Sequence, residues 1–438
     1  MIANVPVHAT QAQSFDCTTI TDIPQVECEA LVAVYSNTAG ATWLDNTGWL
    51  DTSITEICAN WYGIECTDGH VTIVSLQENG LSGSFPAELS SLIHLQNLWL
   101  GGNDLDGTIP PALGQLADLQ ELALWGNLLS GTIPTELGNL SNLQIFDLGD
   151  NQLNGTIPAS LGELSSLQEL VIWGNSLTGQ LPATLNDLVQ LTKLDLSQNQ
   201  LHGPISTGLG NLSQLEQLLL NDNQLDGSIP TEFGNLRNLL QLNLANNQLT
   251  GPIPPPLGQS AELRELILGN NQHTGPIPPT LGQLSNLRAL VLSGNALTGS
   301  IPPELGNLVN LVDNLALNSN QLTGPIPPEL GDLVNLENLS LRSNQLSGSV
   351  PPSLGNLTKL KRLWLYDNSA LSGPLPTTLT ANIVIETLQF QGTDICEPTD
   401  SDFQTWLSAI PTVERSGISC TGNEFIIRST VYLPMVTR

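Results

Sequence analysis

Short stretches of alternating apolar and polar residues return along the chain at a fixed spacing. In residues 95–118, LQNLWLGGNDLDGTIPPALGQLAD, Leu98 and Leu100 alternate with residues of other types, which is the period-two pattern of a strand buried on one face. Asn103 ends the alternation, and further leucines follow at the spacing of a helical or 3-10 turn. Each stretch therefore predicts one short strand, a tight turn and one helical turn.

The stretch recurs thirteen times, and its asparagine is the most regular position. Ten of these asparagines, from Asn79 to Asn295, are each 24 residues apart, and Asn320, Asn344 and Asn368 follow after one inserted residue. The common frame is L-x-x-L-x-L-x-x-N-x-L-x-G-x-I-P-x-x-L-G-x-L-x-x, whose first leucine we number position 1. A period of this length indicates a solenoid, in which each repeat buries its apolar face against its neighbours and both ends need caps.

This frame resembles the plant-type leucine-rich repeat. Its x-L-x-G-x-I-P segment is similar to the repeats of receptor-kinase ectodomains and of polygalacturonase-inhibitor-like proteins, and the resemblance covers residues 71–383. It implies an α/β repeat solenoid, a right-handed superhelix with a parallel sheet on its concave face and disulfide-closed caps. We expect the asparagines to form a ladder that satisfies backbone groups left unpaired in the turns. The resemblance also implies ligand sensing or enzyme inhibition.

All six cysteines lie near the two ends of the chain. Residues 15–70 resemble the N-terminal cap of plant-type repeats. The four cysteines of this segment can pair in three ways, and the resemblance favours Cys17–Cys28 with Cys58–Cys66. The expected disulfides are Cys17–Cys28, Cys58–Cys66 and Cys396–Cys420. The expected divisions are 1–14 (the remnant of an export signal, or a frayed terminus), 15–70 (N-terminal cap), 71–383 (thirteen repeats), 384–420 (C-terminal cap) and 421–438 (a tail: an extra strand, a linker remnant or an anchor).

The charge of the chain excludes several classes of partner. It contains 41 acidic and 11 basic residues, a formal net charge of −30, and its first basic residue is Lys193. Such a field repels phosphate backbones and anionic membranes, so we expect no nucleic-acid partner. No apolar run reaches the ~18–20 residues that a membrane span needs. The disulfides favour an extracellular or cell-surface location. We expect a monomer.

The sequence offers little for catalysis or metal binding. Glu121 and Glu169 share position 3 two strands apart, a separation comparable to that in an inverting glycosidase, but an open face provides nothing to desolvate either acid. The five histidines are scattered along the chain, and His273 replaces a core leucine at position 11. We therefore expect neither an enzyme nor a cofactor or metal site.

Tryptophan appears where the repeat leaves residues outside. In LQELALWGNLLSGTIP, residues 119–134, Trp125 stands at position 7, which faces outward from the strand. The expected N-terminal ligand patch is Trp99, Glu121, Ala123, Trp125, Ile145, Asp147, Asp150, Glu169, Val171 and Trp173. Clustered exposed aromatics are typical of binding surfaces, and the acidic rim favours a cationic ligand. In the alternative interpretation, the rings lie flat on neighbouring strands and only stabilise the face.

A second outward-facing patch lies near the end of the repeats. It combines Arg342, Arg362, Trp364 and Tyr366, for which binding and simple end-packing are both open. The function we expect is extracellular recognition of a protein, peptide or glycan on the concave face. The alternatives are an inhibitor of a cell-wall-degrading hydrolase and a structural or adhesion protein of the cell surface.

Overall fold

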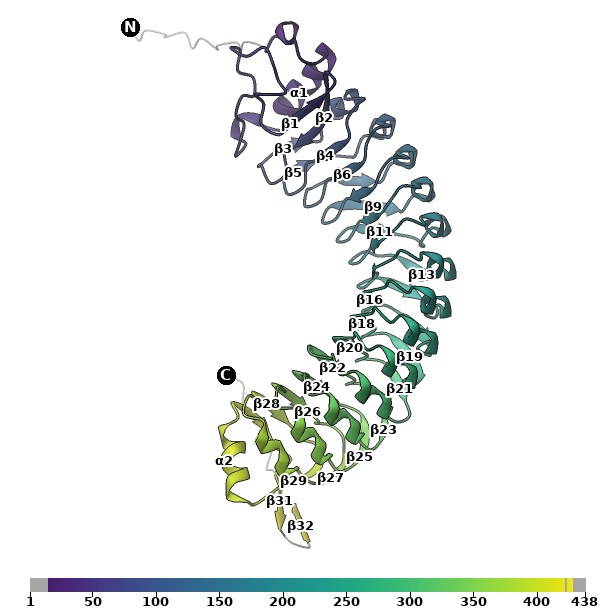
Figure 1. Cartoon of the computed structure of the whole chain (residues 1–438), viewed down its shortest axis with the longest axis vertical. Helices are drawn as coiled ribbons and strands as arrows, with labels where there is room; N and C mark the ends of the chain where they lie inside the picture. The colour runs from purple at the N-terminus through teal and green to yellow at the C-terminus, as the bar shows by residue number, and fades with distance from the viewer. Residues whose placement is uncertain (1–14, 422–423, 428–438) are drawn as a thin grey trace, which may run out of the picture. The chain divides into compact units, whose positions relative to one another are not determined.

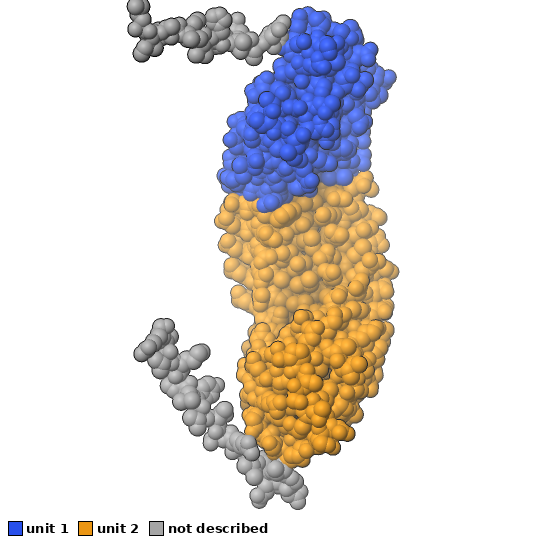
Figure 2. All heavy atoms as spheres, turned by 90° about the vertical axis from the view of Figure 1, so that its left-hand side faces the viewer, with its two compact units in different colours: residues 1–167 blue, residues 168–438 orange. Residues whose placement is uncertain are grey.

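A computed structural model of the chain describes residues 15–421 and 424–427 (Figure 1). The expected export-signal remnant at 1–14 and the parts 422–423 and 428–438 of the expected tail lie outside the described residues. The chain divides into two compact units, residues 1–167 and 168–438, which Figure 2 colours separately. We call them unit 1 and unit 2.

In unit 1, a five-strand section of the long sheet follows the order β1-β2-β4-β6-β8. Strands β1 and β2 are antiparallel, and β2, β4, β6 and β8 pair in parallel with a register of 24 residues, for example Leu98 opposite Leu122. These strands are β1 (Ile64–Thr67), β2 (His70–Ser75), β4 (Asn97–Trp99), β6 (Glu121–Ala123) and β8 (Ile145–Asp147). The parallel stacking expected from the period-two pattern is thus confirmed.

Shorter elements complete each repeat of unit 1. A second row of strands follows the tight turns: β3 (Ser82–Ser84), β5 (Asp104–Asp106), β7 (Ser130–Thr132) and β9 (Gln152–Thr156). The helical elements are η1 (Cys17–Thr19), α1 (Gln25–Asn37), η2 (Gly40–Thr42), η3 (Ala87–Ser91), η4 (Pro111–Gln115), η5 (Thr135–Asn139) and η6 (Ala159–Glu163). The η elements are 3-10 turns, which return the chain to the next strand.

In unit 2, eleven strands of the long sheet follow one another in chain order from β10 to β30. They are β10 (Glu169–Val171), β12 (Lys193–Asp195), β14 (Gln217–Leu219), β16 (Gln241–Asn243), β18 (Glu265–Ile267), β20 (Ala289–Val291), β22 (Asn314–Ala316), β24 (Asn338–Ser340), β26 (Arg362–Trp364), β28 (Thr387–Gln389) and β30 (Thr412–Glu414). The inserted residue does not shift the register, since Ala289 still pairs with Asn314. Val312 and Asp313 absorb it before β22, where both amides donate to the carbonyl of Arg288.

The second row of unit 2 ends in an antiparallel hairpin, β31–β32. Its strands are β11 (Ser176–Thr178), β13 (His202–Pro204), β15 (Gln224–Asp226), β17 (Thr250–Gly251), β19 (Gln272–Pro276), β21 (Ala296–Thr298), β23 (Thr323–Gly324), β25 (Gln345–Gly348), β27 (Ala370–Pro374), β29 (Asp394–Glu397), β31 (Ile418–Thr421) and β32 (Glu424–Ile427). The helical elements are η7 (Ala183–Asp187), η8 (Thr207–Asn211), η9 (Thr231–Asn235), η10 (Pro255–Gln259), η11 (Pro279–Gln283), η12 (Pro303–Asn307), η13 (Pro328–Asp332), η14 (Pro352–Asn356), η15 (Thr377–Ala381) and α2 (Ser401–Ala409).

The asparagine at position 9 connects neighbouring repeats. The side chain of Asn127 accepts a hydrogen bond from the amide of Leu105 at 3.0 Å, and its amide group donates to the carbonyls of Leu100 and Leu124, both at 3.0 Å. The same pattern recurs along both units, so the expected ladder is confirmed. Each asparagine satisfies backbone groups that the turn leaves unpaired inside the core.

Both ends are closed as the resemblance implied. Disulfides join Cys17 to Cys28, Cys58 to Cys66 and Cys396 to Cys420. The N-terminal end is further filled by aromatic rings, among them Trp43 and Trp49 with centroids 4.9 Å apart. At the C-terminal end, Asp400 caps α2 by accepting hydrogen bonds from the amides of Asp402 and Phe403. Among the described residues, no helix has the length and apolar character that crossing a membrane requires.

Candidate functional site

The face of each sheet section that carries positions 3, 5, 7 and 8 points away from the leucine core, and we call it the sheet face. In unit 1 it carries Trp99 and Trp125, which are both partly exposed. The indole N–H of Trp99 donates to the Glu121 carboxylate at 2.9 Å across neighbouring strands. The indole N–H of Trp99 therefore already has its acceptor within the protein.

Trp125 lies against the glycines of the preceding repeat. A Cβ atom added to Gly101 would stand 2.4 Å from the indole nitrogen of Trp125, and one added to Gly102 would stand 3.2 Å from the six-membered ring. The ring of Trp125 therefore fills the space beside Gly102. The geometry agrees with the interpretation in which Trp125 packs flat on a neighbouring strand, and the two glycines provide the room.

The rest of the expected N-terminal patch divides between the two units. Ala123, Ile145, Asp147 and Asp150 belong to unit 1, where Asp150 is exposed and the other three are partly exposed. The remaining residues of the patch, Glu169, Val171 and Trp173, belong to unit 2. Glu169 and Trp173 are partly exposed, but Val171 is only 4% exposed, so the expectation that it offers open surface is wrong.

The structure shows a hollow of ≈ 430 Å³ on the sheet face of unit 2. Its lining residues come from positions 3, 5 and 7 of four successive repeats, on and just after β20, β22, β24 and β26. They are Val291, Ser293, Asn314, Ala316, Asn318, Ser340, Arg342, Trp364 and Tyr366. We call this the terminal hollow. It contains three of the four residues of the second sequence-predicted patch.

The fourth residue, Arg362, is engaged elsewhere. Its guanidinium donates to the side-chain oxygen of Asn338 at 3.0 Å and lies 3.6 Å from the Glu386 carboxylate. By contrast, the guanidinium carbon of Arg342 lies 5.3 Å from the centre of the Tyr366 ring, and no ion pair joins Arg342 to a carboxylate within the described ranges. The cation–π contact holds Arg342 without neutralising it. The two arginines of the patch thus have different roles.

Small polar and apolar residues form the rest of the terminal hollow, and none of them was predicted from the sequence as a site residue. Ser340 stands directly between Ala316 and Trp364 in the sheet register, so a small side chain leaves room beside the indole. The Asn314 side-chain oxygen is buried and accepts no hydrogen bond from the described protein atoms. The 24-residue register was the signal available to find these residues, because it places positions 5 and 7 of successive repeats side by side.

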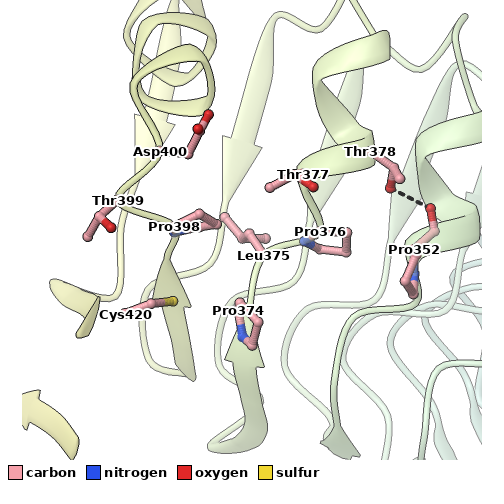
Figure 3. Close-up of a pocket in the computed structure, with 10 residues that line it drawn as sticks. All are labelled: Pro352, Pro374, Leu375, Pro376, Thr377, Thr378, Pro398, Thr399, Asp400 and Cys420. Carbon is pink, nitrogen blue, oxygen red and sulfur yellow. Dashed lines mark hydrogen bonds between the residues drawn. The ribbon is translucent and has the colours of Figure 1, made fainter. Parts of the chain in front are cut away.

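A second hollow, of ≈ 480 Å³, lies at the C-terminal cap (Figure 3). Four prolines contribute to its lining, and its polar groups are partly used within the protein. The Thr378 hydroxyl donates to the carbonyl of Pro352 at 2.6 Å, and Asp400 caps α2. This hollow presents mainly apolar surface, whereas the terminal hollow adds an unneutralised cation and an unpaired acceptor.

Comparison with known proteins identifies the repeats. A leucine rich repeat family model matches residues 117–177, 141–201 and 165–225, and a second Leucine Rich Repeat model matches residues 94–116, 238–260, 262–284, 286–308 and 335–357. No curated protein sequence matches the chain.

Solved structures of plant receptors are similar to the chain. The plant peptide hormone receptor RGFR1 in complex with RGF2 is 36% identical, with a TM-score of 0.67, over 74% of this chain and 55% of that one. A TDR receptor is 30% identical, with a TM-score of 0.69, over 78% and 63%. The Arabidopsis receptor kinase HAESA in complex with the peptide hormone IDA and the co-receptor SERK1 is 28% identical, with a TM-score of 0.68, over 89% and 72%.

The chain spans less than two thirds of the first two receptor structures, so their length exceeds what is present here. The chain itself has a leucine-rich frame, a 24-residue register and an asparagine ladder. These features and the matches to both family models show that the chain belongs to the leucine-rich repeat family.

Proposed function

We propose that the chain is a non-catalytic, extracellular recognition module that binds an extended peptide on the sheet face of unit 2, anchored at the terminal hollow. The observation that carries the proposal is Arg342, a guanidinium that Tyr366 holds beside the hollow and that no carboxylate of the described residues neutralises. A chain with 41 acidic residues and 11 basic ones offers few positive groups to a ligand, and Arg342 is the one that lines the terminal hollow. It suits a hydrogen-bond acceptor or an anionic group on the part of the ligand that meets it.

The surroundings of Arg342 support the same proposal. Trp364 offers an aromatic surface, and Ser293, Asn314 and Asn318 offer hydroxyl and amide groups, which is the mixture typical of ligand sites. The similar structures include the plant peptide hormone receptor RGFR1 in complex with RGF2 and HAESA in complex with the peptide hormone IDA. The three disulfides agree with an extracellular location.

Peptide selection tests this proposal. A random peptide library is selected against the immobilised protein, and the affinity of one selected peptide is measured for wild type, Arg342→Ala and the matched control Arg288→Ala. Arg288 lies outside the terminal hollow and is about half exposed, so its loss should leave binding unchanged. Arg342→Ala should weaken binding by about tenfold or more, as expected for an interface anchor. Equal affinity of all three proteins would refute the terminal hollow as the site.

The class of ligand is tested separately with a glycan array probed by the same protein. If the peptide library yields no ligand but a glycan binds, and Arg342→Ala abolishes glycan binding, the peptide assignment is wrong although the site is correct. If neither the peptide library nor the glycan array yields a ligand, the recognition proposal fails.

A further inference from the structure

Two histidines that are one repeat apart in the sequence meet in unit 1. His70 begins β2, and His94 stands 24 residues later, just before β4. Their ring centroids are 4.1 Å apart with the planes tilted by 51°. The expectation that the histidines are scattered is therefore wrong for this pair, and the 24-residue spacing was the overlooked signal.

A carboxylate faces the Nδ1 atom of each ring. Nδ1 of His70 lies 2.6 Å from the carboxylate of Glu27, whose other oxygen accepts the amide hydrogen of Val71 at 2.8 Å. Glu27 comes from α1 and is 2% exposed. Nδ1 of His94 lies 3.3 Å from the carboxylate of Asp118, at the same repeat position one strand further. Both rings are thus oriented through the same nitrogen.

This orientation fixes where each neutral ring presents its lone pair. An ionised carboxylate can only accept a hydrogen bond, so Nδ1 of each neutral imidazole carries the proton. The lone pair of Nε2 is then available to coordinate a metal ion. A histidine backed by a carboxylate in this way is the usual arrangement around protein-bound transition metals. Two such rings in contact offer two nitrogen ligands at one place.

The charge of unit 1 favours the same occupant. Residues 1–167 contain no lysine or arginine, and the side chains nearest the rings include two carboxylates. A field of this sign raises the local concentration of cations. Imidazole nitrogen suits Zn²⁺, Cu²⁺ and Ni²⁺ better than the oxygen-preferring Ca²⁺ or Mg²⁺.

We propose that His70 and His94 form a binding site for a divalent transition metal, with Zn²⁺ as its representative, through their Nε2 atoms. Among the described residues, no group of three or more His, Cys, Asp or Glu side chains is arranged to hold a metal ion. The site therefore contributes two protein ligands, and water completes the coordination. The bound ion joins the β1–β2 hairpin of the cap to the first repeats, and Glu27 connects the same site to α1.

Zinc titration by calorimetry tests the site on the whole chain, in a buffer that does not bind metal. Every protein also carries His8→Gln, so that this histidine cannot contribute to metal binding. The compared variants are His94→Gln and Asp118→Asn, with His202→Gln on β13 of unit 2 as the matched control. His94 and Asp118 are both partly solvent-accessible, with side chains 43% and 52% exposed, so the variants should fold. Circular dichroism with EDTA present confirms this.

We expect one equivalent of Zn²⁺ to bind to the parent protein and to His202→Gln. His94→Gln should lose this binding, and Asp118→Asn should weaken it by about tenfold, because it removes the group that orients the ring. Electron paramagnetic resonance with Cu²⁺ should show coupling to imidazole nitrogen that His94→Gln reduces. Zinc binding that is unchanged in His94→Gln, or no uptake by the parent protein, would overturn the proposal. Neither result affects the terminal hollow in unit 2.

Discussion

Arg342 and Tyr366 stand at position 7 of neighbouring repeats, with the guanidinium carbon 5.3 Å from the ring centre. The contact places an unneutralised positive charge at the edge of the terminal hollow in a strongly acidic chain. Because the aromatic ring does not cancel the charge, the arginine remains available to an acceptor group of a ligand. Tyr366 is therefore a positioning residue for Arg342.

Tyr366→Leu removes the ring and leaves Arg342 in place. We expect the affinity for a selected peptide to fall by about two- to fivefold, which corresponds to a partly exposed cation–π contact. Tyr366→Phe keeps the ring and should stay close to wild type. Surface plasmon resonance of the three proteins checks this prediction. If Tyr366→Phe loses as much as Tyr366→Leu, the hydroxyl and not the ring is responsible.

The asparagine ladder should be costly to interrupt. Asn127→Ala leaves the buried amide of Leu105 without its partner, whereas the carbonyls of Leu100 and Leu124 lose one of two hydrogen bonds and keep those from the neighbouring asparagines. We expect the free energy of unfolding to drop by about 2–3 kcal/mol, because an unpaired buried amide costs about 1–3 kcal/mol and two further hydrogen bonds are lost. Urea denaturation measures it. Asn142→Ala is the control, since this exposed side chain only donates to the carbonyl of Ala117 and should cost under ~1 kcal/mol.

Gly101 should be intolerant of a side chain because of Trp125. In Gly101→Ala, the new methyl group would overlap the indole, so the ring must leave its place and become more exposed. We expect a red-shifted tryptophan emission that is absent when Trp125 is also changed to Phe. Gly269→Ala is the matched control at the same repeat position, where the nearest atom would be 3.2 Å away. Identical spectra for Gly101→Ala and wild type would contradict the flat packing of Trp125.

His273 should make stability depend on pH. The ring is fully buried at position 11, its Nε2 has no partner among the described atoms, and burial lowers its pKa below the ordinary value of 6.5. Below about pH 6.5, His273 binds a proton in the unfolded chain but stays neutral in the folded chain. The free energy of unfolding therefore falls as the pH falls, until the pH reaches the lowered pKa of the folded state.

His273→Leu restores the residue type that the frame has at position 11 and removes this dependence. We expect the variant to be more stable than wild type by about 1–3 kcal/mol at neutral pH, because the unpaired nitrogen is gone, and the difference should grow toward pH 5.5. Urea denaturation at pH 7.5 and 5.5 measures both effects. A constant difference at the two pH values would show that His273 does not carry the pH dependence.

The fold could be predicted from the sequence because its information repeats. Leu98, Asn103 and their equivalents recur thirteen times, and each recurrence reports the same buried position. The inserted residue before β22 did not disturb this, since Ala289 still pairs with Asn314. The resemblance of the N-terminal cap favoured two of the disulfides, and the third joins the two cysteines near the other end.

The sites were harder to predict, for physical reasons. Trp125 looked exposed because its position faces outward, yet the two glycines opposite allow the ring to lie flat. The terminal hollow exists because Ser340 and Ala316 have small side chains. A search of the sequence for aromatic and charged residues does not find such small residues. Arg342 was found because charge is rare here.

The proposed role of the terminal hollow can be tested most directly by protection of a single thiol. The described part of the chain has no free cysteine, so Ser293→Cys introduces a reactive group into the partly exposed lining of the hollow. Ser300→Cys, exposed and outside the hollow, is the control. Saturating amounts of a selected peptide should slow maleimide labelling at residue 293 and leave labelling at residue 300 unchanged. Labelling of residue 293 at the peptide-free rate would contradict binding at this site.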